Sequence, residues 1–159
     1  LALIPEAERP QVVHQAGEKH LATLEANYAA AGVRANCVAF IEDMAGAYEW
    51  ADLVICRSGA SSLSEVEAMG KASILIPSPN VAENHQYHNA MALVSKDAAV
   101  LIEEKDLTGE RLAQELDRLL SSPQRRRQLE ANAKALAITD ANERIYAVIA
   151  GLAQKDQHS

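Results

Sequence analysis

A run of small and hydroxyl-bearing residues, Ser58-Gly59-Ala60-Ser61-Ser62, follows the apolar stretch "DLVIC" after a single arginine. Glycine and alanine let a ligand approach the backbone closely, and serine hydroxyls are short donors that suit phosphate oxygens. In open α/β sheets, ligands bind beyond the carboxyl ends of the strands, where a following helix directs unpaired backbone N–H groups at them. The run therefore predicts a phosphate-binding turn, although a plain tight turn before a helix favours the same residues.

Glu65 lies three residues after Ser62, and this spacing has two interpretations. Ser-x-x-Glu is a capping box, in which the two side chains satisfy backbone N–H groups at the start of a helix. A carboxylate one turn into such a helix could instead accept hydrogen bonds from a ribose diol. The capping box is the default prediction, and it gives a helix from Ser62 through Met69 that ends at Gly70.

A second polar cluster, Asn84-His85-Gln86, opens the next predicted helix within "NVAENHQYHNA". These side chains offer both donors and acceptors, which suits the hydroxyls of a sugar. The helical pattern over residues 84–96 predicts that Asn84, His85 and Gln86 face the crevice, whereas Tyr87 and Met91 face the core. The two clusters follow neighbouring strands, so we expect them to lie at one edge of the sheet.

Three other chemistries fit the sequence poorly. A serine nucleophile elbow needs Gly-x-Ser-x-Gly, but around Ser61 the second glycine position is Leu63. His85 and His88 could share a zinc ion, but no third ligand lies at a recognisable spacing. The dinucleotide fingerprint Gly-x-Gly-x-x-Gly is absent. We therefore expect no hydrolase, no oxidoreductase, no metal site and no cofactor.

Composition narrows the possible partners. The net charge is −7 and aromatic residues make up 4% of the chain, so a phosphate backbone is repelled and base stacking is not supported. Nucleic acid is not expected as a partner. Cys37 and Cys56 fall in apolar runs without Cys-x-x-Cys spacing, which predicts two buried thiols in a reducing, cytoplasmic compartment. Arg125-Arg126-Arg127 follows Ser122-Pro123, a helix start, and is interpreted as a solvated helix face.

Short apolar strands alternate with amphipathic helices along the 159 residues, a pattern typical of βαβ units. The predicted fold class is α/β, with a Rossmann-like doubly wound parallel sheet. Buried strands are expected around residues 52–59 and 73–77. Asp43 is expected to cap the short helix "MAGAYEWA" that follows it. Helices are predicted over 18–31, 108–121 and 122–137, with a last helix starting at an Asp140/Glu143 capping box. Residues 1–153 form the predicted domain, and 154–159 form a disordered tail.

The segment "FIEDMAGAYEWADLVICRSGASSLSEVEAMGKASILIPSPNVAENHQYHNA" resembles the C-terminal, donor-binding domain of the MurG family. This family comprises the UDP-N-acetylglucosamine-dependent N-acetylglucosaminyltransferases of peptidoglycan synthesis, which convert lipid I into lipid II. The resemblance covers about residues 12–150, and its most specific parts are "RSGA…SE" and "NHQ…NA". It implies the C-terminal half of an inverting GT-B glycosyltransferase, whose two Rossmann-like domains face each other across a cleft.

The same resemblance implies a role for each site residue. Ile41 would meet the uracil, and Glu65 would accept hydrogen bonds from the ribose hydroxyls. Gln86 and the adjacent His85 would bind hydroxyls of the N-acetylglucosamine. The diphosphate and ribose would be wrapped by the segment Ala60, Ser61, Ser62, Leu63, Ser64 and Glu65. Family members of this type usually need no protein-bound metal for the leaving group.

What the family has and this sequence lacks is also informative. The acceptor loop, the candidate catalytic base and the membrane-docking patch belong to the family's N-terminal domain, so lipid I would bind there and this chain alone is expected to be inactive. The first strand of the C-terminal domain, with its Gly-Gly-Ser turn, is also missing, so its neighbours should expose backbone edges. The parent enzyme would be peripheral on the cytoplasmic face of the inner membrane, without direct membrane contact by this acidic domain.

Two alternatives remain open from the sequence. One is another UDP-sugar enzyme of the same architecture, such as a UDP-N-acetylglucosamine 2-epimerase, which donor preference would separate from the transferase. The other is a non-catalytic α/β binding module, in which Ser62 and Glu65 only cap a helix. Fold alone licenses none of these choices.

Overall fold

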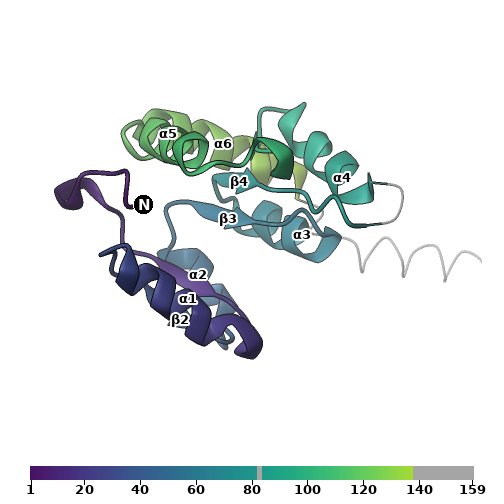
Figure 1. Cartoon of the computed structure of the whole chain (residues 1–159). Helices are drawn as coiled ribbons and strands as arrows, with labels where there is room; N and C mark the ends of the chain where they lie inside the picture. The colour runs from purple at the N-terminus through teal and green to yellow at the C-terminus, as the bar shows by residue number, and fades with distance from the viewer. Residues whose placement is uncertain (82–83, 138–159) are drawn as a thin grey trace, which may run out of the picture.

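The computed structural model describes residues 1–81 and 84–137. Strands and helices alternate along the chain, as predicted (Figure 1). The predicted helix at Asp140, the tail 154–159 and the boundary at residue 153 lie outside the described residues. The elements are β1 (Val13–Gln15), α1 (Glu18–Ala30), β2 (Asn36–Val38), α2 (Met44–Trp50), β3 (Val54–Cys56), α3 (Ala60–Met69), β4 (Ser73–Leu75), α4 (His85–Val94), β5 (Val100–Leu101), α5 (Gly109–Leu120) and α6 (Pro123–Leu136), with short 3-10 helices at Glu6–Glu8 and Glu104–Asp106.

The described strands pair in parallel, which confirms the α/β class. β1 pairs with β2, whereas β3, β4 and β5 form a second sheet with β4 in the middle. Parallel strands need crossover connections, and each crossover here contains a helix. The turns that follow β3 and β4 therefore lie at the same edge of the second sheet.

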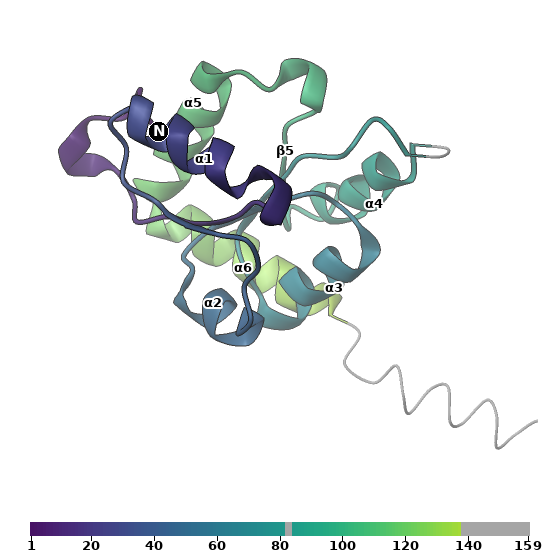
Figure 2. The same ribbon diagram turned by 60° about the horizontal axis from the view of Figure 1, so that its bottom comes forward.

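β4 lies at the centre of the core, and the second sheet is covered on both of its faces. Ile74 and Leu75 are both fully buried but point to opposite faces, because side chains alternate along a strand. Ile74 packs in a cluster with leucines of α5 and α6, whereas Leu75 packs with residues of α3 and α4. α3 also packs alongside α6 (Figures 1 and 2). This two-sided covering is the doubly wound arrangement that the sequence predicted.

The two sheets are separate, and each ends in an unpaired strand. Among residues 1–81 and 84–137, β1 hydrogen-bonds only to β2, and β3 hydrogen-bonds only to β4; Figure 1 shows the two sheets apart. Val13 on β1 is 37% exposed and Ile55 on β3 is 44% exposed. The prediction of a buried strand around residues 52–59 is therefore wrong at Ile55, because no strand of the described part of the chain pairs with the outer edge of β3. The expectation of exposed backbone edges, by contrast, agrees with the described sheets.

Helix boundaries follow local side-chain chemistry. Asp43 caps α2, as predicted, because its Oδ1 accepts from the Gly46 N–H at 2.9 Å. Ser122 caps α6 by accepting from the Arg125 N–H, and Pro123 occupies the first turn, where its missing N–H costs nothing. Gly70 ends α3 in the left-handed conformation with φ of 60°, which few other residues adopt without strain.

Two predictions about side-chain placement were wrong. Arg125 and Arg126 do not form a merely solvated face, because Arg125 pairs with Asp97 and Arg126 donates to the carbonyls that end α5. Cys37 and Cys56 are free thiols, as expected, but both are half-buried rather than fully buried. Arg125 and Arg126, unlike the two cysteines, contact other elements, and the sequence pattern did not show these elements to be adjacent.

Asp97 follows α4 in the left-handed conformation and joins it to α6. The Arg125 guanidinium donates to both carboxylate oxygens at 2.6 and 2.7 Å, Gln128 donates to the carboxylate, and the Asn132 amide donates to the backbone carbonyl. The hydrogen bonds from Arg125 lower the pKa of Asp97 below its usual value. This contribution to stability is present above the ordinary aspartate pKa and is lost as the pH falls through the lower folded-state pKa.

We expect a double-mutant cycle of Asp97→Asn and Arg125→Met to give a coupling free energy of about 0.5–1 kcal/mol at pH 7, since the pair is half-exposed. Asparagine tolerates the left-handed conformation, so the change isolates the charge. Urea unfolding at a series of pH values measures the coupling. It should fade only below about pH 4; a coupling already lost at pH 5 contradicts this account.

Candidate functional site

The turn between β3 and α3 differs from the predicted capping box. α3 begins at Ala60, and its N-cap is Gly59, which has no side chain to cap with. Ser62 lies inside the first turn, and Leu63 is the residue whose N–H donates back to the Gly59 carbonyl. The capping box of Ser62 and Glu65 is therefore wrong, because the helix starts two residues earlier. The N–H groups of Ala60, Ser61 and Ser62 have no intrahelical acceptor.

The side chains of this first turn alternate between solvent and core. Ala60, Ser61, Ser64 and Glu65 are exposed, and Ser62 is half-buried. Leu63 is 5% exposed and packs in the core cluster on the α3 side of the sheet. Leu63 can therefore offer a ligand little more than its backbone. The exposed first turn presents backbone donors and hydroxyls, and Glu65 presents an exposed carboxylate in the second turn.

Glu65 makes one side-chain hydrogen bond among the described residues. Its Oε2 accepts from the Tyr48 hydroxyl at 3.0 Å. Tyr48 lies in α2 and is 7% exposed. Burial, followed by this hydrogen bond and the glutamate charge, raises the pKa of Tyr48, so the hydroxyl stays protonated as a donor. The two residues are 17 positions apart, and no spacing pattern predicted this contact.

Ser58 brings the two polar clusters together. Its side chain is fully buried, and its hydroxyl donates to the Gln86 carbonyl at 2.8 Å. The Asn89 amide donates to the Ser58 carbonyl at 3.3 Å. These two bonds tie the turn before α3 to the first turns of α4. The prediction that the clusters meet at one edge of the sheet is confirmed, and Asn89 is a linking residue that the sequence analysis did not single out.

The start of α4 lies beside this turn. Asn84 is its N-cap in the left-handed conformation, with φ of 54°, and Asn84 and His85 are exposed. Gln86 is half-buried, and its Oε1 accepts from the Ser78 N–H at 2.9 Å. The Gln86 side chain therefore supports the loop after β4.

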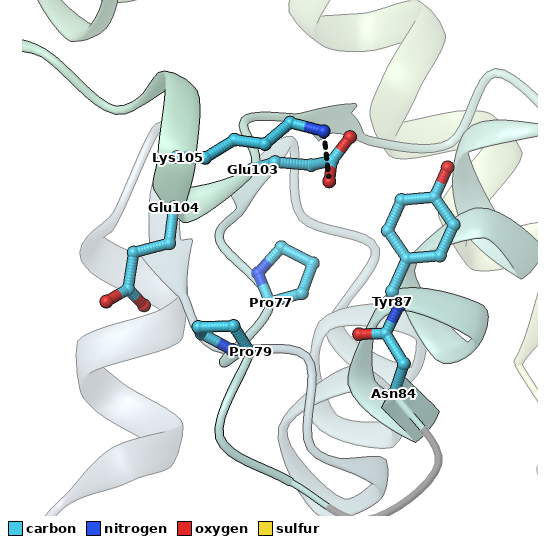
Figure 3. Close-up of a pocket in the computed structure, with 7 residues that line it drawn as sticks. All are labelled: Pro77, Pro79, Asn84, Tyr87, Glu103, Glu104 and Lys105. Atoms are coloured by element: carbon cyan, nitrogen blue, oxygen red, sulfur yellow. Dashed lines mark ion pairs between the residues drawn. The ribbon is translucent and has the colours of Figure 1, made fainter.

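Tyr87 does not face the core as predicted. The buried face of α4 is formed by Ala90 and Leu93, while Tyr87 and Met91 are only half-buried. Figure 3 shows Tyr87 beside a hollow whose rim carries the ion pair of Lys105 and Glu103, 3.1 Å apart. The other lining residues are Pro77, Pro79, Asn84 and Glu104. At about 80 Å³ the hollow is too small for a nucleotide sugar, since ligand pockets span roughly 300–1,000 Å³.

Arg57 connects the ends of the three strands of the second sheet. Its Nη1 donates to the carbonyls of Ile76 and Pro77 after β4 and lies 2.6 Å from the Glu104 carboxylate after β5. The side chain is 51% exposed. Arg57 thereby fixes the loops that border the candidate site and leaves a cationic face toward solvent.

Ile41 lies three residues beyond the end of β2. Its N–H donates to the Gln15 Oε1 at 2.9 Å, and the neighbouring Phe40 is 68% exposed. A base that hydrogen-bonds this N–H must displace the Gln15 side chain. The sequence analysis did not identify Gln15, because a polar residue at a strand end carries no particular signal.

Cys56 lies directly before the turn and is half-buried. Burial, with a smaller contribution from the Glu65 charge, raises the pKa of the Cys56 thiol to about 11. The thiolate is the nucleophilic form, so this thiol is inert near neutral pH. Within the described ranges no group of histidine, cysteine and carboxylate side chains could hold a metal ion, and none of the helices there is long and apolar enough to cross a bilayer.

Comparison with known proteins identifies the family. Residues 2–145 match the model of the glycosyltransferase family 28 C-terminal domain. The chain belongs to glycosyltransferase family 28. This match covers both polar clusters of the candidate site.

Named relatives of this family 28 domain agree with the resemblance to the MurG family. The UDP-N-acetylglucosamine--N-acetylmuramyl-(pentapeptide) pyrophosphoryl-undecaprenol N-acetylglucosamine transferase of Dechloromonas aromatica (strain RCB) is 47% identical over 156 residues, covering 97% of this chain and 43% of the relative. The enzyme of the same name from Geobacter sp. (strain M21) is 46% identical, covering 92% and 39%. The chain thus spans about two fifths of the length of these relatives.

A solved structure shows the same fold. The crystal structure of Acinetobacter baumannii MurG superposes with a TM-score of 0.80 at 33% sequence identity, over 89% of this chain and 41% of that one. The resemblance inferred from "RSGA…SE" and "NHQ…NA" is therefore confirmed at the level of family and fold.

Proposed function

We propose that this chain is the donor-binding half of an inverting hexosyltransferase. It binds UDP-N-acetylglucosamine, and the complete enzyme passes the sugar to lipid I to give lipid II in peptidoglycan synthesis. The diphosphate lies on the first turn of α3, and Glu65 accepts from the ribose hydroxyls. The remaining contacts are Ile41 with the uracil, and His85 and Gln86 with the sugar.

The observation that carries the proposal is the state of Glu65. The sequence predicted Glu65 to be part of a capping box, but the N-cap of α3 is Gly59 and, within the described residues, the Glu65 side chain makes no capping hydrogen bond. Its exposed carboxylate lies in the second turn of α3, and the first turn of the same helix carries three backbone N–H groups without intrahelical acceptors and the exposed Ser61. A nucleoside diphosphate needs hydrogen-bond acceptors for its ribose hydroxyls and donors for its phosphate oxygens. The first two turns of α3 offer both.

The same geometry supports the chemistry of a transferase. When the bond between the sugar and the phosphate breaks, negative charge develops on the departing UDP. The N-terminus of α3 carries a partial positive charge and fixed N–H donors, which stabilise that charge without reorganisation. This leaving-group stabilisation requires no metal ion, which is consistent with the family's usual chemistry.

The relatives are longer than this chain. We propose that the additional part of the enzyme carries out the acceptor half of the reaction. Lipid I, the catalytic base and the membrane contact belong there, and the complete enzyme works at the cytoplasmic face of the inner membrane. This domain carries a net charge of −7, so anionic headgroups repel it. The isolated chain is proposed to bind donor without transferring its sugar.

Calorimetric titration of the 159-residue chain with UDP-N-acetylglucosamine and UDP-N-acetylgalactosamine tests the proposal. The two sugars differ in the orientation of one hydroxyl. We expect roughly tenfold tighter binding of the gluco sugar, because a lost hydrogen bond leaves a polar group unpaired. Gln86→Ala should reduce this selectivity, whereas Gln114→Ala, on the exposed face of α5, should not change it.

Each alternative function predicts a different result. A folded chain that binds neither nucleotide sugar contradicts the proposal and favours a non-catalytic module. Equal affinity for the two sugars, unchanged by Gln86→Ala, removes the assignment of N-acetylglucosamine and favours another UDP-sugar enzyme. Far-ultraviolet circular dichroism on the same samples establishes whether the chain is folded.

A further inference from the structure

A hydrogen bond between Tyr48 and Glu65 joins α2 to α3. Tyr48 lies in α2, near its C-terminal end, and Glu65 lies in the second turn of α3. The Tyr48 hydroxyl donates to the Glu65 Oε2 at 3.0 Å. The tyrosine is almost wholly buried, whereas the glutamate is exposed. The buried Tyr48 hydroxyl therefore orients a Glu65 carboxylate that faces solvent.

Tyr48 can orient the carboxylate because its own ring is packed in the core. The ring packs in the core cluster with Leu63 and Val66 of α3, and Met44 and Cys56 pack against the same cluster. A glutamate side chain, by contrast, has three rotatable bonds and loses up to about 2 kcal/mol of conformational entropy when it is ordered. The hydrogen bond orders Glu65 before any ligand arrives, which lowers the entropic cost of binding.

The hydrogen bond also makes the two carboxylate oxygens of Glu65 different from each other. Oε2 is engaged by Tyr48, while Oε1 has no hydrogen-bond partner among the described residues. An ionised carboxylate has about four acceptor sites, so Oε1 keeps its full capacity and Oε2 keeps part of it. Two adjacent hydroxyl donors of a ribose match this remaining capacity.

We propose that Tyr48 is a positioning residue of the donor site, whose hydroxyl fixes one oxygen of Glu65 so that the other accepts from the ribose hydroxyls. This inference rests on the proposed function. Tyr48 itself does not touch the nucleotide, because its side chain is buried behind Glu65. It acts on ribose recognition and not on the diphosphate or the sugar.

The test compares UDP with 2′-deoxy-UDP and 3′-deoxy-UDP, because a deoxy ligand reports the ribose contact alone. We expect the wild-type chain to prefer UDP over at least one deoxy ligand by roughly tenfold or more, as for a hydrogen bond to a charged group. Tyr48→Phe keeps the packed ring but removes the donor. It should weaken UDP binding several-fold and reduce that preference to less than half.

A matched control separates this effect from a general loss of a tyrosine hydroxyl. Tyr28→Phe removes a hydroxyl that contacts His14, 3.0 Å away on the first sheet, and does not touch Glu65. It should leave the preference for UDP unchanged. If Tyr48→Phe also leaves the preference unchanged, the hydrogen bond is only structural and the inference is overturned.

A second variant keeps the inference testable if Tyr48→Phe fails to fold. Glu65→Asp, at an exposed position, retains the charge but withdraws the carboxylate from Tyr48 by one methylene. The preference for UDP should fall as it does in Tyr48→Phe, and a preference of wild-type size in Glu65→Asp counts against the inference. A wild-type chain that binds UDP and both deoxy ligands equally, or binds none of them, refutes the proposed role of Glu65 itself.

Discussion

Ala60→Asp is expected to weaken binding of UDP-N-acetylglucosamine about a hundredfold while leaving the fold slightly more stable. Ala60 is the first residue of α3, and its side chain is exposed, so the aspartate meets no steric barrier. Two charges of the same sign about 4 Å apart repel by ~1 kcal/mol in water and ~4 kcal/mol near a protein surface. A diphosphate on this turn would experience that repulsion directly.

The stability of Ala60→Asp is expected to change in the opposite direction. A carboxylate in the first turn of a helix interacts favourably with the macrodipole, by about 0.3–1 kcal/mol. Calorimetric titration measures the affinity, and thermal unfolding measures the stability. Ala60→Asn has nearly the same size without the charge and should affect binding far less. Undiminished affinity in Ala60→Asp would show that no diphosphate lies at the start of α3.

Ile74→Ala is expected to cost about 2–5 kcal/mol of unfolding free energy, the range for removing a large buried aliphatic side chain. Ile74 is fully buried at the centre of β4 and packs against leucines of α5 and α6. The cavity lies between elements that cannot both move toward it, because Arg126 and the carbonyls of Leu119 and Leu120 join α5 to α6. A loss of this size threatens the whole fold, since small domains are stable by only 5–15 kcal/mol.

Ile55→Ala provides the matched control. Ile55 is the direct strand partner of Ile74 in the register of β3 and β4, but it is 44% exposed. The same substitution there should cost about 1 kcal/mol or less. Urea unfolding followed by circular dichroism compares the two variants. Equal losses would show that the outer edge of β3 is covered in solution, contrary to the separate sheets described above.

Local signals predicted the elements well because they depend on neighbouring residues. Asp43 and Ser122 cap the predicted helices, and the buried run "SILIP" forms β4 as expected. The capping box failed because Gly59 can start a helix without a side-chain cap, and nothing in the sequence distinguishes the two starts. The interpretation of Arg125 and Arg126 failed because their partners lie on other elements and are visible only in three dimensions.

In the candidate site, too, the sequence predicted local features but not contacts between distant residues. The sequence placed the two polar clusters at one edge of the sheet, because parallel strands direct the turns that follow them to the same side. It could not show Ser58 bonding Gln86, Gln15 occupying the Ile41 N–H, or Tyr48 holding Glu65, since these contacts span 17 to 28 residues. Long-range contacts of single polar groups leave no periodicity to detect.

The separate sheets give the two ends of the candidate site unequal local stability. The proposed diphosphate site rests on β4, α3 and α4, which contribute fully buried residues to the core. The proposed uracil contact follows β2 in the first sheet, where neither β1 nor α1 contains a buried residue. Segments with few buried contacts open at a small fraction of the global free energy. In this chain the proposed phosphate site therefore lies on the part of the fold with the larger buried core, and we expect the backbone amides around the proposed uracil contact at Ile41 to exchange with solvent faster.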